Sequence, residues 1–186
     1  MYIYKRSYMN EPSVFSKESA KVIDQGFVPI LGASPSVLIL GTLPSVKSLE
    51  KSQYYGNPQN AFWWMMSQLL GFDLNESYEK RCQLIKAHSI AAWDVIASCH
   101  RPGSLDSKID QSTLKPNDFS SVLGLTSTVR LVAFNGQAAC KLFSKYVQIE
   151  AHPQLEFITL PSTSPANAAM SKETKKQQWL KIMKYV

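Results

Sequence analysis

Residues 37–70 read VLILGTLPSVKSLEKSQYYGNPQNAFWWMMSQLL, and this stretch decides the fold. It opens on the apolar run 37–40, whose length and β-branched content predict a buried strand. Gly41 and the four residues after it interrupt the run, as strand-to-loop turns do. Asn60 stands directly before the helical spacing of 61–70, and because asparagine is a favoured N-cap we expect the helix to begin there. In open α/β sheets the loop between such a strand and helix lies at the carboxyl edge, where ligands bind.

This loop combines flat aromatic rings with neutral amides. Tyr54 and Tyr55 offer π faces, whereas Asn57, Gln59 and Asn60 can both donate and accept hydrogen bonds. A flat, uncharged, hydrogen-bonding ligand such as a nucleobase suits these groups. Ordinary packing is the alternative interpretation, and it is the more frequent origin of an aromatic-rich loop.

The rest of the chain alternates strands with helices. Further strands are expected at 89–97, 129–134 and 156–160, and further helices at 76–87 after Asn75, at 136–146, and after the cap Ser171. A short helix capped by Asn117 or Asp118 is expected to end near Gly124. The pattern predicts the α/β class, specifically a three-layer α/β/α fold around a central four-stranded, mainly parallel sheet. Residues 1–25 show no clear period and are expected to form an N-terminal extension, with 26–186 as a single domain.

Composition narrows the class of protein. The chain has 186 residues, 45% hydrophobic and 18% charged, which fits a soluble globular protein. No apolar run approaches the roughly 20 residues of a membrane helix, and residues 1–15 lack a secretory signal, so a cytoplasmic location is expected. The net charge is +6, and most of the positive excess lies after residue 170, where the sequence has five lysines and a single acidic residue, Glu173. That segment fits either a solvated helix face or attraction to nucleic-acid phosphates.

Four sequence blocks closely resemble motifs of the uracil-DNA glycosylase superfamily. They are GTLPS with the following SL and QYYGNPQNAFW (41–63), WDVIASCHRPGSLDSKI (93–109), VAFNGQAACKLF (132–143) and LPSTSPANA (160–168). The nearest branches are the mismatch-specific glycosylases and, above all, the DNA-deoxyinosine (hypoxanthine) glycosylases. The resemblance implies a monofunctional DNA glycosylase of base excision repair. Such an enzyme flips a deaminated base out of DNA and hydrolyses its N-glycosidic bond, with hypoxanthine as first and uracil as second substrate.

The resemblance also points to the residue that positions the attacking water. Mismatch-specific relatives use an asparagine two residues after the glycine of the first motif, where this chain has Leu43. The deoxyinosine branch lacks that asparagine and uses the one in the P-x-N-x-F-W segment, which is Asn60 here. A plain helix cap is the alternative role. Relatives commonly carry histidine before the proline of this segment, whereas this chain has Asn57, which cannot carry a proton.

Further site residues follow from the same motifs. Tyr55 matches the aromatic residue that stacks on the flipped base, a contact worth about 1–3 kcal/mol. Asp94 is a second catalytic candidate, because a carboxylate beside the sugar can stabilise positive charge or orient water. The alternative is a carboxylate that only caps a loop. The full set expected to bind the base is Gly41, Thr42, Leu43, Pro44, Ser45, Tyr55, Asn57, Phe62 and Asn135.

The last motif is expected to contact DNA. Ser162 and Ser164 can bind phosphates, and Ser164 or Pro165 can fill the emptied base stack. Relatives often begin this motif with a histidine or asparagine that contacts the base, which Leu160 cannot replace. The expected DNA-binding residues are Ser162, Thr163, Ser164, Pro165 and Asn167.

No cofactor is expected. Cys82, Cys99 and Cys140 are too few for the four-cysteine iron–sulfur cluster of some relatives, and the three histidines lack metal-ligand spacing. The expected partner is DNA containing deaminated bases, bound by a monomer that is not attached to a membrane. Two alternatives stay open: a uracil or thymine mismatch glycosylase, and an inactive nucleic-acid-binding module that lost catalysis through Leu43, Asn57 and Leu160. A flavodoxin-like nucleotide binder is disfavoured, because no glycine-rich phosphate loop occurs.

Overall fold

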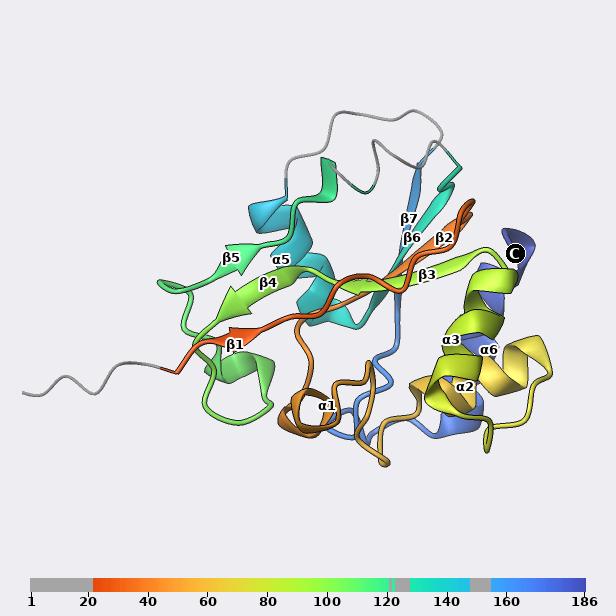
Figure 1. Ribbon diagram of the computed structural model, residues 1–186, viewed down its shortest axis with the longest axis horizontal. Helices are drawn as coiled ribbons and strands as arrows, with labels where there is room; N and C mark the ends of the chain where they lie inside the picture. Colours follow the sequence, from red (N-terminus) through yellow and green to blue (C-terminus); the bar gives the residue numbers. More distant parts are fainter. Residues whose placement is uncertain (1–21, 121, 123–127, 148–154) are drawn as a thin grey trace, which may run out of the picture.

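A four-stranded parallel sheet forms the centre of the computed structural model, which describes residues 22–120, 122, 128–147 and 155–186 (Figure 1). The strand order is β3-β2-β6-β7, and every neighbouring pair is parallel. Each strand is five residues long: β2 (Val37–Gly41), β3 (Ile90–Asp94), β6 (Leu131–Asn135) and β7 (Glu156–Leu160). All residues of β2 and β3 are buried, as expected of strands covered on both faces.

Helices cover both faces of this sheet. In Figure 1, α2 (Phe62–Leu70), α3 (Tyr78–Ala87) and α6 (Lys172–Trp179) gather on one side, and α5 (Gln137–Tyr146) lies on the other. A 3-10 segment, Leu180–Lys184, continues α6, and the short helix α1 (Val46–Lys51) follows β2. The hydrophobic core between these layers includes completely buried side chains from α2 and α6, among them Phe62, Met65 and Trp179. The predicted three-layer α/β/α fold is therefore confirmed.

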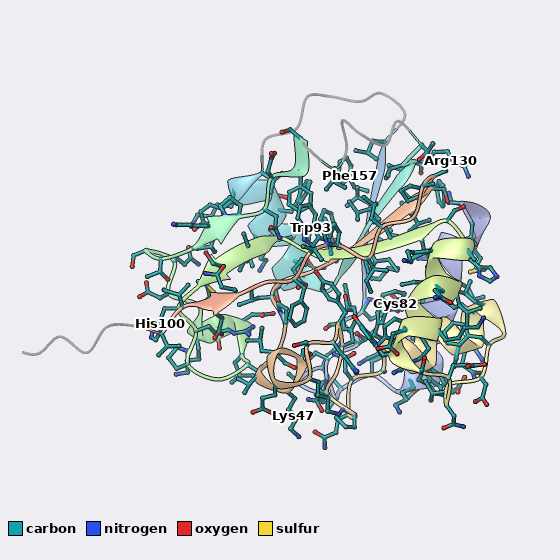
Figure 2. All side chains as sticks on the ribbon, in the orientation of Figure 1. Lys47, Cys82, Trp93, His100, Arg130 and Phe157 are labelled. Carbon is teal, nitrogen blue, oxygen red and sulfur yellow. The ribbon has the colours of Figure 1, made fainter. Side chains whose placement is uncertain are left out.

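A second, smaller sheet is antiparallel and was not expected. It consists of β1 (Asp24–Gln25), β4 (Ile96–Cys99) and β5 (Lys115–Pro116), in the order β1-β4-β5. The single strand predicted over 89–97 is therefore wrong, because the chain leaves the parallel sheet after Asp94 and enters this second sheet. The apolar pattern continues across the change of sheet, so it carries no signal of the break. Trp93, next to the break, lies in the middle of the molecule, whereas Lys47 and His100 lie at its periphery (Figure 2).

Several element ends differ from those predicted. Ala61, not Asn60, is the formal N-cap of α2, although Asn60 Oδ1 accepts the Phe62 N–H at 3.0 Å. Ser77, not Asn75, caps α3, and the loop predicted after β2 contains α1. The cap Ser171 and the strand 156–160 are confirmed.

Two sequence predictions reach beyond the described part of the chain. The short helix expected to end near Gly124 extends outside it, and so does most of the expected extension 1–25. Within the extension, Asp24 and Gln25 pair with β4, so these two residues belong to the folded unit. Among the described residues, no helix has the length and apolar character needed to cross a membrane.

Candidate active site

A small cavity opens where the carboxyl ends of the parallel strands converge. The register places Gly41 opposite Asp94 and Asn135 opposite Leu160. The cavity measures about 90 Å³ and is lined by the loop after β2 together with side chains from the other strand ends. The loops that follow β2 and β7 meet below the sheet (Figure 1), and the backbone N–H of Ala61 donates to the carbonyl of Thr163 at 2.9 Å. The first and last motifs of the sequence therefore form one site.

Asp94 is the most unusual titratable group of this cavity. Its side chain is buried, and its Oδ2 atom has no hydrogen-bond partner among the described residues. A Cβ atom at position 41 would collide with Asp94 Oδ1, so the carboxyl group lies directly against the backbone of Gly41. Burial raises the pKa of Asp94 to about 7, an effect that the Arg101 guanidinium opposes and the Asp106 carboxylate reinforces. Asp94 can therefore exchange a proton near neutral pH.

Tyr55 provides the aromatic wall of the cavity. Its backbone adopts a left-handed φ of 54°, and its ring stacks on Phe62 with centroids 3.7 Å apart and planes 15° apart. Because Phe62 covers one face, the opposite face is the one that can receive a base. The Tyr55 hydroxyl is buried beside the Asn135 side chain, and burial and Asp94 raise its pKa more than the contact with Asn135 lowers it. The hydroxyl therefore stays protonated and can donate to a ligand.

Asn60 lies between Tyr55 and the start of α2. Its backbone N–H donates to the carbonyl of Asn57 at 2.9 Å, and its side-chain oxygen accepts from the Phe62 N–H at 3.0 Å. An amide oxygen has two lone pairs, so one hydrogen bond to the helix leaves capacity for a water molecule. The helix-capping role and the water-positioning role are therefore compatible.

Arg101 holds the loop after β2 in place, a role that sequence reasoning missed. Its buried guanidinium donates to the carbonyls of Leu43 and Pro44. The same group pairs with Asp24 at 3.6 Å and with Asp106 at 4.0 Å. Arg101 belongs to the block 93–109, which resembles a family motif, but no sequence feature links it to Leu43 and Pro44, which are 58 and 57 positions away.

Ser104 and Asp106 of the same block reinforce this arrangement. Ser104 Oγ accepts the Val46 N–H at 3.0 Å, and Asp106 Oδ1 accepts from Thr42 Oγ1 at 2.7 Å. Both bonds tie the loop after β2 to the segment after β4. The sequence assigned no role to either residue.

Comparison with known proteins identifies the family. The family model described as the uracil DNA glycosylase superfamily matches residues 28–185. This chain belongs to the uracil-DNA glycosylase superfamily.

Curated relatives and a solved structure agree with this assignment. A Methanosarcina acetivorans protein named hypoxanthine DNA glycosylase is 36% identical over 165 residues, which cover 88% of this chain and 100% of the relative. A protein of the same name from Methanosarcina barkeri is 34% identical over 161 residues, covering 86% and 98%. The solution NMR structure of a candidate uracil DNA glycosylase from Methanosarcina acetivorans superposes with a TM-score of 0.71 at 36% identity, covering 87% and 96%.

Most of the predicted superfamily residues meet at the cavity. Those that line it are Gly41, Thr42, Leu43, Pro44, Ser45, Tyr55, Asn60, Asp94, Asn135, Ser162 and Ser164. Two residues predicted to bind the base do not line it. Phe62 is completely buried and supports Tyr55 from behind, and Asn57 lines a neighbouring pocket.

The last motif divides into residues that face the cavity and residues that hold the loop. Thr163 is buried and exchanges two hydrogen bonds with the Asn135 side chain, at 2.8 and 2.9 Å, so it fixes the loop. Asn167 donates to the Ser162 carbonyl at 3.3 Å, and its own carbonyl accepts from Lys175. Pro165 is exposed on the loop surface.

The sequence also predicts that the protein holds neither a metal ion nor a cofactor. Among the described residues, no three histidine, cysteine, aspartate or glutamate side chains are arranged to hold a metal ion. Cys82, Cys99 and Cys140 are all free thiols. That the protein works without a cofactor stays a prediction.

Replacing Arg101 with methionine is expected to lower the free energy of unfolding by about 2 kcal/mol. The loop carbonyls would lose their donor, and Asp24 and Asp106 would lose their counter-ion. Urea unfolding of the two proteins measures the difference. Lys108→Met, in an exposed part of the same block, is the control and is expected to be neutral; equal midpoints for Arg101→Met and wild type would refute the role of Arg101.

Proposed function

We propose that this protein is a monofunctional DNA glycosylase that removes hypoxanthine from deoxyinosine in DNA and leaves an abasic site. The observation that carries the proposal is the cavity at the carboxyl edge of the sheet, which unites Tyr55, Asn60 and Asp94. The two relatives named hypoxanthine DNA glycosylase support the choice of base, because they align along nearly their whole length. We further propose that the enzyme acts as an intracellular monomer.

The roles of the three residues follow from the chemistry of the bond. As the C1′–N9 bond breaks, its electron pair leaves with the base and the sugar gains oxocarbenium character. The Asn60 amide oxygen holds the water that attacks C1′, and the Asp94 carboxylate takes the proton which that water loses. Tyr55 stacks on the extrahelical base and keeps it in the cavity. The negative charge of Asp94 also favours the positive sugar of the transition state.

Uracil is the second substrate in this proposal. Deamination gives both hypoxanthine and uracil a carbonyl group next to a ring N–H, and several residues with hydroxyl side chains line the cavity beside Gly41. Groups of this kind can both donate and accept, so they suit either base. Adenine and cytosine carry an amino group in place of the carbonyl, and they would leave a cavity donor unpaired.

The direct test is cleavage of duplexes that contain deoxyinosine, deoxyuridine or a G·T mismatch, with an undamaged duplex as control. We expect free hypoxanthine and strand breaks that appear only after alkali, fastest with deoxyinosine and slower with deoxyuridine. Breaks without alkali would contradict a monofunctional enzyme. Preference for the G·T mismatch would favour the mismatch-specific alternative, and binding without any base release would favour the inactive module.

A further inference from the structure

A second pocket lies beside the catalytic cavity and shares Tyr55 and Asn60 with it. Its volume is about 270 Å³. Three positively charged side chains line it, from elements far apart in the sequence: Lys51 at the end of α1, Arg81 in α3 and Lys172 at the start of α6. No acidic side chain is among its lining residues. The fold therefore gathers three cations next to the site of base removal.

Two of these cations, Arg81 and Lys172, lie over aromatic rings. Within the described part of the chain, none of the three forms an ion pair. The Arg81 guanidinium lies over Trp63 at 4.8 Å, and the Lys172 ammonium lies over Trp64 at 5.7 Å. Such contacts orient a cation without neutralising it.

Arg81 is partly buried, whereas Lys51 and Lys172 are exposed. Its Nε atom is buried without a hydrogen-bond partner among the described residues, and burial lowers the pKa of the guanidinium. A buried donor without an acceptor and a set of mutually repelling charges both cost free energy. A bound anion would relieve the repulsion between the charges.

We propose that this pocket binds a phosphate diester of the substrate strand, next to the nucleotide whose base enters the cavity. The inference rests on the proposed function and extends it to the way in which the strand is held. An arginine fork matches two phosphate oxygens, and lysines add charge without fixed geometry. Since Tyr55 and Asn60 line both spaces, a strand whose base stacks on Tyr55 would bring a neighbouring phosphate close to this pocket. Phosphate contacts of this kind set register and orientation.

The first test removes the three charges. The pocket variant carries Lys51→Gln, Arg81→Gln and Lys172→Gln. The control variant carries Lys80→Gln, Lys141→Gln and Lys181→Gln, three exposed lysines that line neither space. Binding is measured against salt with a duplex that contains 2′-fluoro-deoxyinosine, which resists cleavage. We expect the pocket variant to bind about tenfold more weakly and to lose about one unit of the salt slope relative to the control.

The second test locates the phosphate. Each phosphate around the deoxyinosine is replaced in turn by a neutral methylphosphonate. One replacement is expected to weaken wild-type binding about tenfold and to leave the pocket variant unaffected, since the same contact is already lost. If the pocket variant fails to fold, both measurements are made instead on the single variants Lys51→Gln and Lys172→Gln, whose positions are exposed.

Three results would overturn the inference. The first is equal affinity and salt slope for the pocket and control variants. The second is that no methylphosphonate replacement weakens the wild type while leaving the pocket variant unaffected; a replacement that does so identifies what we call a masked phosphate. The third is competition by inorganic phosphate without a masked phosphate, which would assign the pocket to a small anion. If wild type releases hypoxanthine while the pocket fails these tests, the proposed function stands. If a masked phosphate is found but no base is released, the pocket stands and the proposed function fails.

Discussion

Replacing Asn60 with alanine is expected to lower the rate of hypoxanthine release by about 100- to 1,000-fold, the cost of removing one fixed polar group from a transition state. Asn60 lines the cavity together with Tyr55 and Asp94, and its side-chain oxygen keeps a free lone pair after accepting the Phe62 N–H. Without that oxygen, the attacking water loses its position against C1′. Single-turnover cleavage of a deoxyinosine duplex measures the effect without interference from product release.

The matched control separates catalysis from helix capping. Asn60→Ser keeps an oxygen that can accept the Phe62 N–H but shortens the side chain, so it should preserve stability and still lose activity. Asn60→Ala should lose both, with about 1 kcal/mol of stability lost with the cap. A serine variant with wild-type activity would reduce Asn60 to a helix cap. Wild-type activity in both variants would mean that another residue positions the attacking water, with Asp94 as the next candidate.

The sequence predicts the parallel sheet and the cavity for a simple reason. Four short apolar runs alternate with helical patterns, and the carboxyl ends of parallel strands must share one edge. Gly41 and Asn135 each follow such a run directly, so their convergence follows from topology. Asp94 lies inside the run predicted over 89–97, and the structure shows that the parallel strand ends there. The family resemblance adds Asn60 and Tyr55 from the loop that joins the first strand to its helix.

What the sequence does not predict depends on contacts between distant segments. Arg101 reaches the carbonyls of Leu43 and Pro44 only because β4 leaves the parallel sheet, and the continuous apolar pattern hides that departure. Thr163 shows the same limit within a recognised motif. Its position in the last block suggested a DNA contact, whereas its two hydrogen bonds to Asn135 fix the loop.

Replacing Asp94 with asparagine is expected to make the protein more stable at pH 8 and much less active. Burial raises the pKa of this carboxyl from 3.8 to about 7, so between these values the folded state holds a proton that the unfolded state has lost. The free energy of unfolding of the wild type therefore falls as pH rises from about 4 to about 7, by up to about 4 kcal/mol. Asparagine has nearly the same shape and stays neutral, so the variant should lack this fall. Urea unfolding at pH 5 and pH 8 measures both proteins.

Activity should move in the opposite direction, because the costly negative charge is the form that catalysis uses. The single-turnover rate of the wild type is expected to rise with pH through about 7 as Asp94 becomes a carboxylate, whereas Asp94→Asn should be about 100-fold slower or worse and independent of pH there. A wild-type rate that falls with rising pH would make Asp94 a proton donor to the leaving base. A variant that is both less stable than wild type at pH 8 and fully active would refute the buried charge and its catalytic role together. A variant that is more stable and nearly inactive would mean that the site keeps a buried carboxylate at the expense of stability because the developing positive charge on the sugar requires it.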